Sequence, residues 1–164
     1  MKASRQKVRV LMVCLGNICR SPTAHGVFLH RIERAGLSEF IEVDSAGTGD
    51  WHIGKQPDPR TCRAAQARGY DLTPLRARQV RADDFEKFDY ILAMDGENLR
   101  NLQALCPPHL KHKVKLFLDF AGDADGVRYV PDPYYGEEDG FQKVLDLVEN
   151  ASGSLLDHIR RQHL

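Results

Sequence analysis

Short apolar runs alternate with amphipathic segments along this chain, and the alternation predicts strands and helices in turn. Runs of mainly β-branched and aliphatic residues are typical of buried strands, and they occupy residues 8–14, 40–43, 90–94 and 114–118. Helices are expected between them, from Pro22 to a stop at Gly36 and over residues 58–68, 82–88 and 97–105.

The C-terminal segment has apolar residues at helical spacing, which predicts one amphipathic helix. They are Phe141, Val144, Leu145, Val148, Leu155, Leu156 and Ile159. Gly153 lies among them and predicts a weak point in that helix, because glycine disfavours helix interiors. A long loop rich in glycine and aspartate, residues 119–135, precedes this helix.

Strands that alternate with helices favour an α/β fold. We expect a single-domain open parallel four-stranded sheet with helices on both faces and right-handed crossovers. One domain accounts for residues 1–164, with residues 1–7 as a frayed basic lead-in. Ligands in such folds bind beyond the carboxyl ends of the strands.

Charge and cysteine content narrow the function classes. Lysine plus arginine and aspartate plus glutamate both number 23, and this balance argues against nonspecific nucleic-acid binding. No apolar run is long enough to cross a membrane, and four cysteines do not make a dense disulfide framework. The expectation is a cytoplasmic protein without nucleic-acid or membrane partners.

The most informative stretch runs from Cys14 to Pro22, between a predicted strand and a predicted helix. Backbone N–H groups that converge at a helix N-terminus form an anion site. Arg20 adds a fork for two phosphate oxygens, and the same positive field favours thiolate at Cys14. Gly16 allows close approach of the backbone, and Asn17 tolerates positive φ. The predicted cradle comprises Leu15, Gly16, Asn17, Ile18, Cys19, Arg20 and Ser21, with Cys14 as the nucleophile.

These residues resemble the low-molecular-weight protein tyrosine phosphatases. The string Cys14-Leu15-Gly16-Asn17-Ile18-Cys19-Arg20-Ser21-Pro22 and the distant Asp132-Pro133-Tyr134-Tyr135 carry the resemblance, with weaker likeness at 44–48, 58–60 and 88–95. The resemblance implies hydrolysis of phosphotyrosine in proteins through a phosphocysteine, with no cofactor and no metal. It also implies that the Ser21 hydroxyl donates to the thiolate.

Other site residues are assigned with that family pattern in view. Asp132 is the candidate general acid and then base. Trp51, Tyr134 and Tyr135 are candidate walls for an aromatic ring. Ser45 is expected to support Asn17. His25 departs from the pattern, since the family commonly has glutamate there, and its effect is left open.

Two further readings stay open at this point. The first is a thiol-dependent arsenate reductase, which shares this fold and cradle. That activity needs an additional nearby cysteine pair, and Cys62 and Cys106 lie far apart in sequence.

The second alternative is a catalytically silent module that binds phosphorylated partners. The oligomeric state is not fixed by the sequence, with a weak homodimer among the options.

Cys19 carries a redox hypothesis. It lies five residues after Cys14 on a loop that curls around one anion, so a protective Cys14–Cys19 disulfide competes with simple packing of Cys19 beneath the loop. Whether Tyr134 or Tyr135 is phosphorylated is also left open.

Overall fold

The computed structural model describes residues 7–121, 128–133 and 139–164. Its strands are β1 (Val8–Cys14), β2 (Ile41–Gly47), β3 (Tyr90–Ala93) and β4 (Val114–Leu116). They form one parallel sheet in the order β2-β1-β3-β4. The predicted four-stranded parallel α/β fold is therefore confirmed.

The helices are close to those expected. They are α1 (Arg20–Arg34), α2 (Pro59–Gln66), α3 (Asp84–Lys87), α4 (Gly96–Leu105) and α5 (Asp139–His163), with 3₁₀ turns η1 (Pro108–Lys113) and η2 (Phe117–Phe120). The turn η1 was not expected. Pro107 and Pro108 rule out a continuation of α4 but allow a new 3₁₀ turn to start at once.

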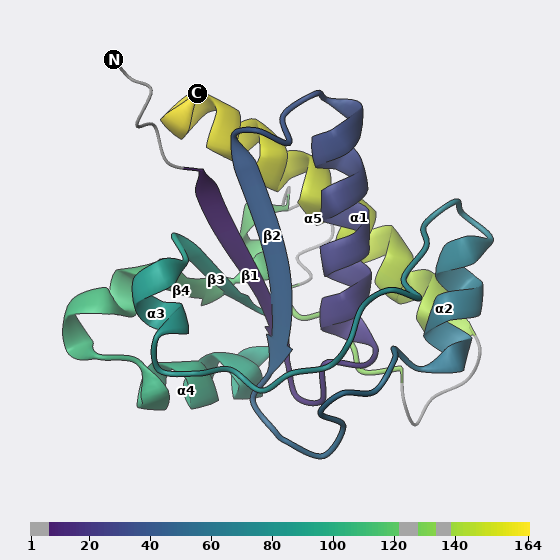
Figure 1. The fold of residues 1–164 in the computed structure, drawn as a ribbon, viewed down its shortest axis with the longest axis horizontal. Helices are drawn as coiled ribbons and strands as arrows, with labels where there is room; N and C mark the ends of the chain where they lie inside the picture. The colour runs from purple at the N-terminus through teal and green to yellow at the C-terminus, as the bar shows by residue number, and fades with distance from the viewer. Residues whose placement is uncertain (1–6, 122–127, 134–138) are drawn as a thin grey trace.

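Strand β1 separates two apolar cores because its side chains alternate between the faces of the sheet. Val10 and Met12 face one core with Phe28 of α1 and Val148 of α5. Leu11 and Val13 face the other, with Phe85, Ile91 and Leu102 among its members. In Figure 1, α1 and α5 accordingly lie on one side of the sheet, and α3 and α4 lie on the other.

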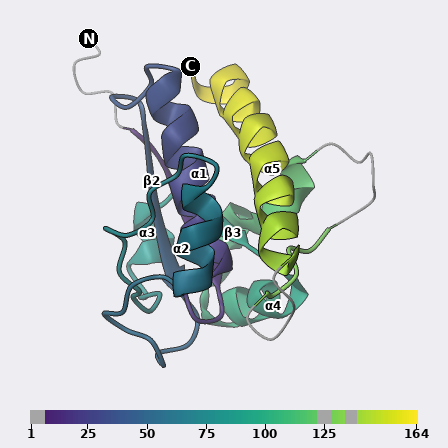
Figure 2. The ribbon, with the colours of Figure 1, turned by 90° about the vertical axis from the view of Figure 1, so that its right-hand side faces the viewer.

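Helix α5 is continuous and lies beside α1 across one face of the sheet (Figure 2). The expected weak point at Gly153 does not interrupt it. A Cβ at Gly153 would lie 3.4 Å from the Arg31 guanidinium carbon, so the glycine leaves room for the Arg31 side chain to cross α5. Arg31 Nη2 then donates to the Glu149 carbonyl at 3.0 Å.

Two strand ends differ from the prediction. Strand β2 was expected to stop at Val43 because polar residues follow, but it continues to Gly47, which pairs in register with Cys14. The polar Asp44 is accommodated because its carboxylate pairs with the Arg78 guanidinium at 3.1 Å. Strand β4 stops at Leu116, and the apolar residues after it form η2, since hydrophobicity alone does not separate a strand from a buried 3₁₀ turn.

The parallel strands bring their carboxyl ends to one edge of the sheet. Cys14 ends β1 just before α1, and β3 is followed by Asp95, the N-cap of α4. In Figure 1 the β1 and β2 arrowheads point toward this edge. No helix of the described ranges is long and apolar enough to span a bilayer.

Candidate active site

The phosphate loop, residues 14–20, turns from β1 into α1 without a side-chain cap at the helix start. Asn17 adopts φ 59°, the left-handed conformation predicted to be tolerated there. The loop is held from outside by Asp58 N, which donates to the Ile18 carbonyl at 2.8 Å. The Asn17 and Ser21 N–H groups are directed toward the inside of the loop.

Three donors or potential donors surround the Cys14 sulfur. The Asn17 and Ser21 backbone N–H groups donate to Sγ at 3.3 and 3.4 Å, and the Ser21 hydroxyl oxygen lies 3.1 Å away. Cys14 and Ser21 are both buried. Such a set of converging dipoles stabilises negative charge on sulfur.

The side chain of Asn17 links the loop to a second layer of residues. Its Nδ2 donates to the Ser21 oxygen at 2.7 Å, and its Oδ1 accepts from the Arg78 backbone N at 3.0 Å. The sequence assigned this supporting role to Ser45. Arg78 fills it in the structure, and the Ser45 hydroxyl lies 2.9 Å from His25 Nδ1 instead.

Arg20 lies almost fully buried at the base of the site, with 3 % of its surface exposed. Nη1 donates to Asp95 Oδ2 at 2.6 Å and to the Val130 carbonyl at 3.0 Å, while Nη2 lies 3.7 Å from Asp132 Oδ2. Burial by itself would lower the pKa of Arg20, but the charges of Cys14, Asp95 and Asp132 outweigh it and raise that pKa. Arg20 thus stays a cation.

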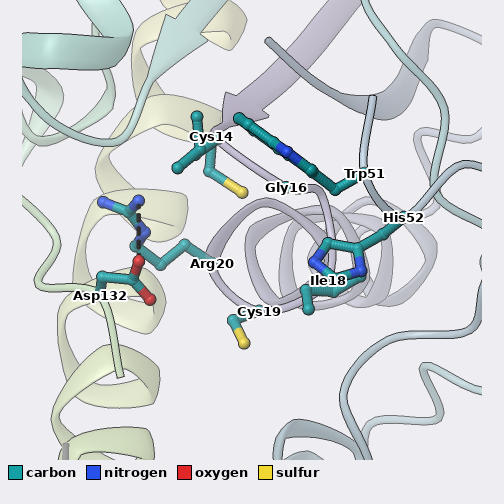
Figure 3. Close-up of a pocket in the computed structure, with 9 residues that line it drawn as sticks. Cys14, Gly16, Ile18, Cys19, Arg20, Trp51, His52 and Asp132 are labelled. Atoms are coloured by element: carbon teal, nitrogen blue, oxygen red, sulfur yellow. Dashed lines mark ion pairs between the residues drawn. The ribbon is translucent and has the colours of Figure 1, made fainter. Parts of the chain in front are cut away.

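A pocket of about 340 Å³ opens above the loop (Figure 3). Its lining consists of Cys14, Leu15, Gly16, Ile18, Cys19, Arg20, Trp51, His52 and Asp132. In Figure 3 the Cys14 sulfur points into the space between Arg20 and Trp51, and a dashed line joins Arg20 to Asp132. The structure therefore brings together Cys14, Arg20 and Asp132, which lie up to 118 residues apart in the sequence.

Of the three aromatic residues predicted to line the substrate pocket, the structure describes one. Trp51 lines the pocket with 65 % of its surface exposed, which is unlike a core residue. Its neighbour His52, which the sequence analysis did not select, lines the pocket as well. Tyr134 and Tyr135 lie outside the described residues.

His25, the departure from the family pattern, is a buried residue of α1 that contacts Ser45 of β2. Burial lowers its pKa from the ordinary 6.5, and the nearby Arg78 cation acts in the same direction while Asp44 opposes both. The imidazole of His25 is therefore neutral, and its Nδ1 atom has a hydrogen-bond partner in the Ser45 hydroxyl.

Cys19 also lines the pocket. Burial raises the pKa of Cys19 to about 12, so it is a neutral thiol near pH 7. Figure 3 shows the two sulfur atoms pointing in different directions. All four cysteines are free thiols in this structure.

Metal-ligating side chains do not gather in the part of the chain that the structure describes. No group of three or more histidine, cysteine or carboxylate side chains is close enough there to hold an ion. Backbone N–H groups and Arg20 supply a positive field at the phosphate loop.

Two supporting residues were missed by sequence reasoning. Asp95 belongs to the family-like stretch 88–95, and its position directly after a buried strand is typical of a helix N-cap. Its second oxygen reaches Arg20, which no local pattern indicates. Arg78 contributes mainly through its backbone N–H, and a backbone contact carries no residue-specific signal.

Comparison with known proteins gives one consistent family. Residues 9–164 match the family described as low molecular weight phosphotyrosine protein phosphatase. A protein of that name from Schizosaccharomyces pombe is 49 % identical over 156 residues, covering 92 % of this chain and 98 % of its own.

Solved structures agree with the sequence match. A protein tyrosine phosphatase from Entamoeba histolytica, with Hepes in the active site, superposes with a TM-score of 0.92 at 40 % identity, covering 96 % of this chain and all of its own. A Drosophila arginine phosphatase superposes at 0.84 with 32 % identity, covering 92 % and 97 % of the two chains. The chain therefore belongs to the family of low molecular weight phosphotyrosine protein phosphatases.

Proposed function

We propose that this protein hydrolyses phosphotyrosine in proteins through a covalent phosphocysteine on Cys14. One observation carries the proposal: the Cys14 sulfur, the Arg20 guanidinium and the Asp132 carboxylate line a single pocket at the start of a helix. They are the nucleophile, the phosphate ligand and the proton donor that cleavage of an aryl phosphate requires.

In the first step the Cys14 thiolate attacks phosphorus, so that an S–P bond forms while the bond from phosphorus to the phenolic oxygen breaks. Arg20 and the loop N–H groups bind the non-bridging oxygens, whose charge the transition state redistributes. Asp132, protonated, gives its proton to the departing phenolic oxygen.

In the second step a water molecule attacks the phosphocysteine. Asp132, now a carboxylate, accepts a proton from that water as its oxygen bonds to phosphorus. The S–P bond breaks, and Cys14 returns as thiolate, held again by the Ser21 hydroxyl and two N–H groups. Inorganic phosphate leaves, so the enzyme is regenerated with no change in oxidation state.

The walls of the pocket support an aromatic leaving group. Leu15 and Ile18 of the phosphate loop and Trp51 outside it present apolar surface to the pocket, which suits a phenyl ring better than a charged group. Phosphotyrosine-containing proteins are therefore the proposed partners. The proposed setting is the cytoplasm, where thiols such as Cys14 remain reduced.

The placement of the other cysteines disfavours arsenate reduction. Cys62 packs on the core that contains Met12, whereas Cys106 belongs to the core on the opposite face of the sheet. No cysteine pair beside Cys14 is thus available from these two residues to resolve an oxidised intermediate.

One substrate panel tests the proposal. We expect the purified protein to hydrolyse nitrophenyl phosphate and a phosphotyrosine peptide, with Cys14→Ser inactive on both. Phosphoarginine and arsenate with added thiol serve as the competing substrates. Faster turnover of phosphoarginine than of phosphotyrosine, or thiol-dependent arsenate reduction, would replace the proposed substrate class, and binding without turnover would indicate a docking module.

A further inference from the structure

The side chain of Trp51 lies directly against Gly49, two residues earlier in the same loop. A Cβ added to Gly49 would lie 2.9 Å from Cη2 of the indole and still closer to Cζ3 and Cε3. Real Cβ atoms do not approach a ring this closely, so the present position of the indole requires a residue without a side chain at 49.

The main chain at Gly49 is itself fixed to the phosphate loop. Gly49 N donates to the Leu15 carbonyl at 2.9 Å, and Thr48 N donates to the Cys14 carbonyl at 2.9 Å. Just before them, a Cβ at Gly47 would lie 2.7 Å from the Leu15 oxygen, so the two segments are in close contact. The backbone at Gly49 therefore cannot move away from the indole without breaking contacts to the catalytic loop.

The indole, by contrast, is free to give way. Trp51 is 65 % exposed, so a new rotamer costs little burial. The φ of Gly49 is not in the left-handed region, and an alanine there has no backbone strain to overcome. A side chain at 49 should therefore displace the ring and leave the fold intact.

We propose that Gly49 is the positioning residue for Trp51, and that it sets the selection of aromatic over non-aromatic phosphate esters. Gly49 is not among the residues that line the pocket. It lets the indole rest on a main-chain segment that is hydrogen-bonded to the nucleophile's own loop, so the resting position of the aromatic wall is defined relative to Cys14. The selectivity part of this inference rests on the proposed function.

The test is a double-mutant cycle between Gly49→Ala and Trp51→Ala. In Gly49→Ala we expect the KM for nitrophenyl phosphate to rise about 3- to 10-fold, the range for loss of one aromatic contact. The inhibition constant of inorganic phosphate should stay within about twofold, because the loop amides and Arg20 bind it. In a Trp51→Ala background, Gly49→Ala should add nothing further.

Fluorescence gives a readout that does not depend on activity. Trp51 is the single tryptophan of the chain, so emission and acrylamide quenching report on this ring alone. We expect both to change in Gly49→Ala and to change further in Gly49→Ser. Unchanged fluorescence would overturn the positioning role, even if the unmodified protein proved to have no phosphatase activity.

Two other results would also overturn the inference. One is an unchanged KM for nitrophenyl phosphate in an active Gly49→Ala enzyme. The other is a rise in KM caused by Gly49→Ala that persists in the Trp51→Ala background. A folding defect of Gly49→Ala that Trp51→Ala does not repair counts in the same way. In both cases the added methyl group would conflict with the main chain and not with the indole. Failure of the proposed function is recognised separately, by absence of turnover in the unmodified protein.

Discussion

The Asn17 side-chain amide donates to the Ser21 hydroxyl oxygen at 2.7 Å, and this contact determines where the Ser21 proton points. Asn17 Oδ1 is occupied by the Arg78 N–H, so the amide presents its NH₂ group to Ser21. The Ser21 oxygen therefore accepts from Asn17 and turns its own O–H toward the Cys14 sulfur, 3.1 Å away.

Replacement of Ser21 tests this direction. In Ser21→Ala the thiolate loses its hydroxyl donor, and sulfur must leave as thiolate in the second step. A hydrogen bond to a charged group is worth about 1.5–3 kcal/mol, so hydrolysis of the phosphocysteine should slow about 10- to 100-fold. Rapid-quench measurement of the two steps is the assay, and an effect confined to the first step would contradict this assignment.

The contact between Asp95 and Arg20 predicts a second effect. Asp95→Asn keeps the shape and, through its one acceptor oxygen, the α4 cap, but it turns an NH₂ group toward Arg20 Nη1 and removes the charge there. We expect kcat/KM to fall about 10- to 100-fold, because the charged hydrogen bond to Arg20 is lost. Asp83→Asn is the matched control, since Asp83 is exposed and pairs with the exposed Arg81. An equal loss in both variants would argue against a role through Arg20.

The outcome for Asp95 illustrates what the sequence could predict. The phosphate loop was predictable because Cys14 and Arg20 lie six positions apart and one strand-loop-helix unit determines their geometry. The contact of Arg20 with Asp95 spans 75 residues and depends on β1 and β3 being neighbours, which alternation of strands and helices does not specify. Similarly, β2 extends beyond its apolar residues. Its pairing with β1 and the contact of Asp44 with Arg78 stabilise the polar residues in strand conformation.

The buried imidazole of His25 predicts a dependence of stability on pH. Burial lowers its pKa in the folded state below the ordinary 6.5, so below pH 6.5 the unfolded chain binds a proton that the folded protein takes up less readily. The free energy of unfolding should therefore fall as the pH drops below about 6.5. Urea unfolding from pH 7 to 5 should show a steeper fall in the unmodified protein than in His25→Gln. Parallel curves would remove His25 as the cause.

The neutral thiol of Cys19 sharpens the redox hypothesis. Peroxide should inactivate the enzyme reversibly, with dithiothreitol restoring activity and a peptide joined through Cys14 and Cys19 in the mass spectrum. Because the pKa of Cys19 is about 12, closure of the disulfide should accelerate roughly tenfold per pH unit in the neutral range. If Cys19→Ser recovers as fully as the unmodified enzyme, Cys19 has no protective role.

Asp132 is tested through the leaving group. Asp132→Asn cannot donate a proton, so turnover of a phosphotyrosine peptide should fall about 10²–10⁴-fold. The loss should shrink for a nitrophenyl ester, whose phenolate leaves with little help. Equal losses across a series of leaving groups would mean that Asp132 positions Arg20 or the substrate and does not protonate the phenol.

Rapid-quench trapping of the phosphoenzyme tests the central claim most directly. The enzyme is mixed with nitrophenyl phosphate, quenched within a single turnover, digested and analysed by mass spectrometry. The account predicts one added phosphoryl group on the peptide that contains Cys14, formed at a rate no slower than turnover and absent in Cys14→Ser. Turnover without that adduct, or a phosphoryl group on another residue formed at a competent rate, would contradict it.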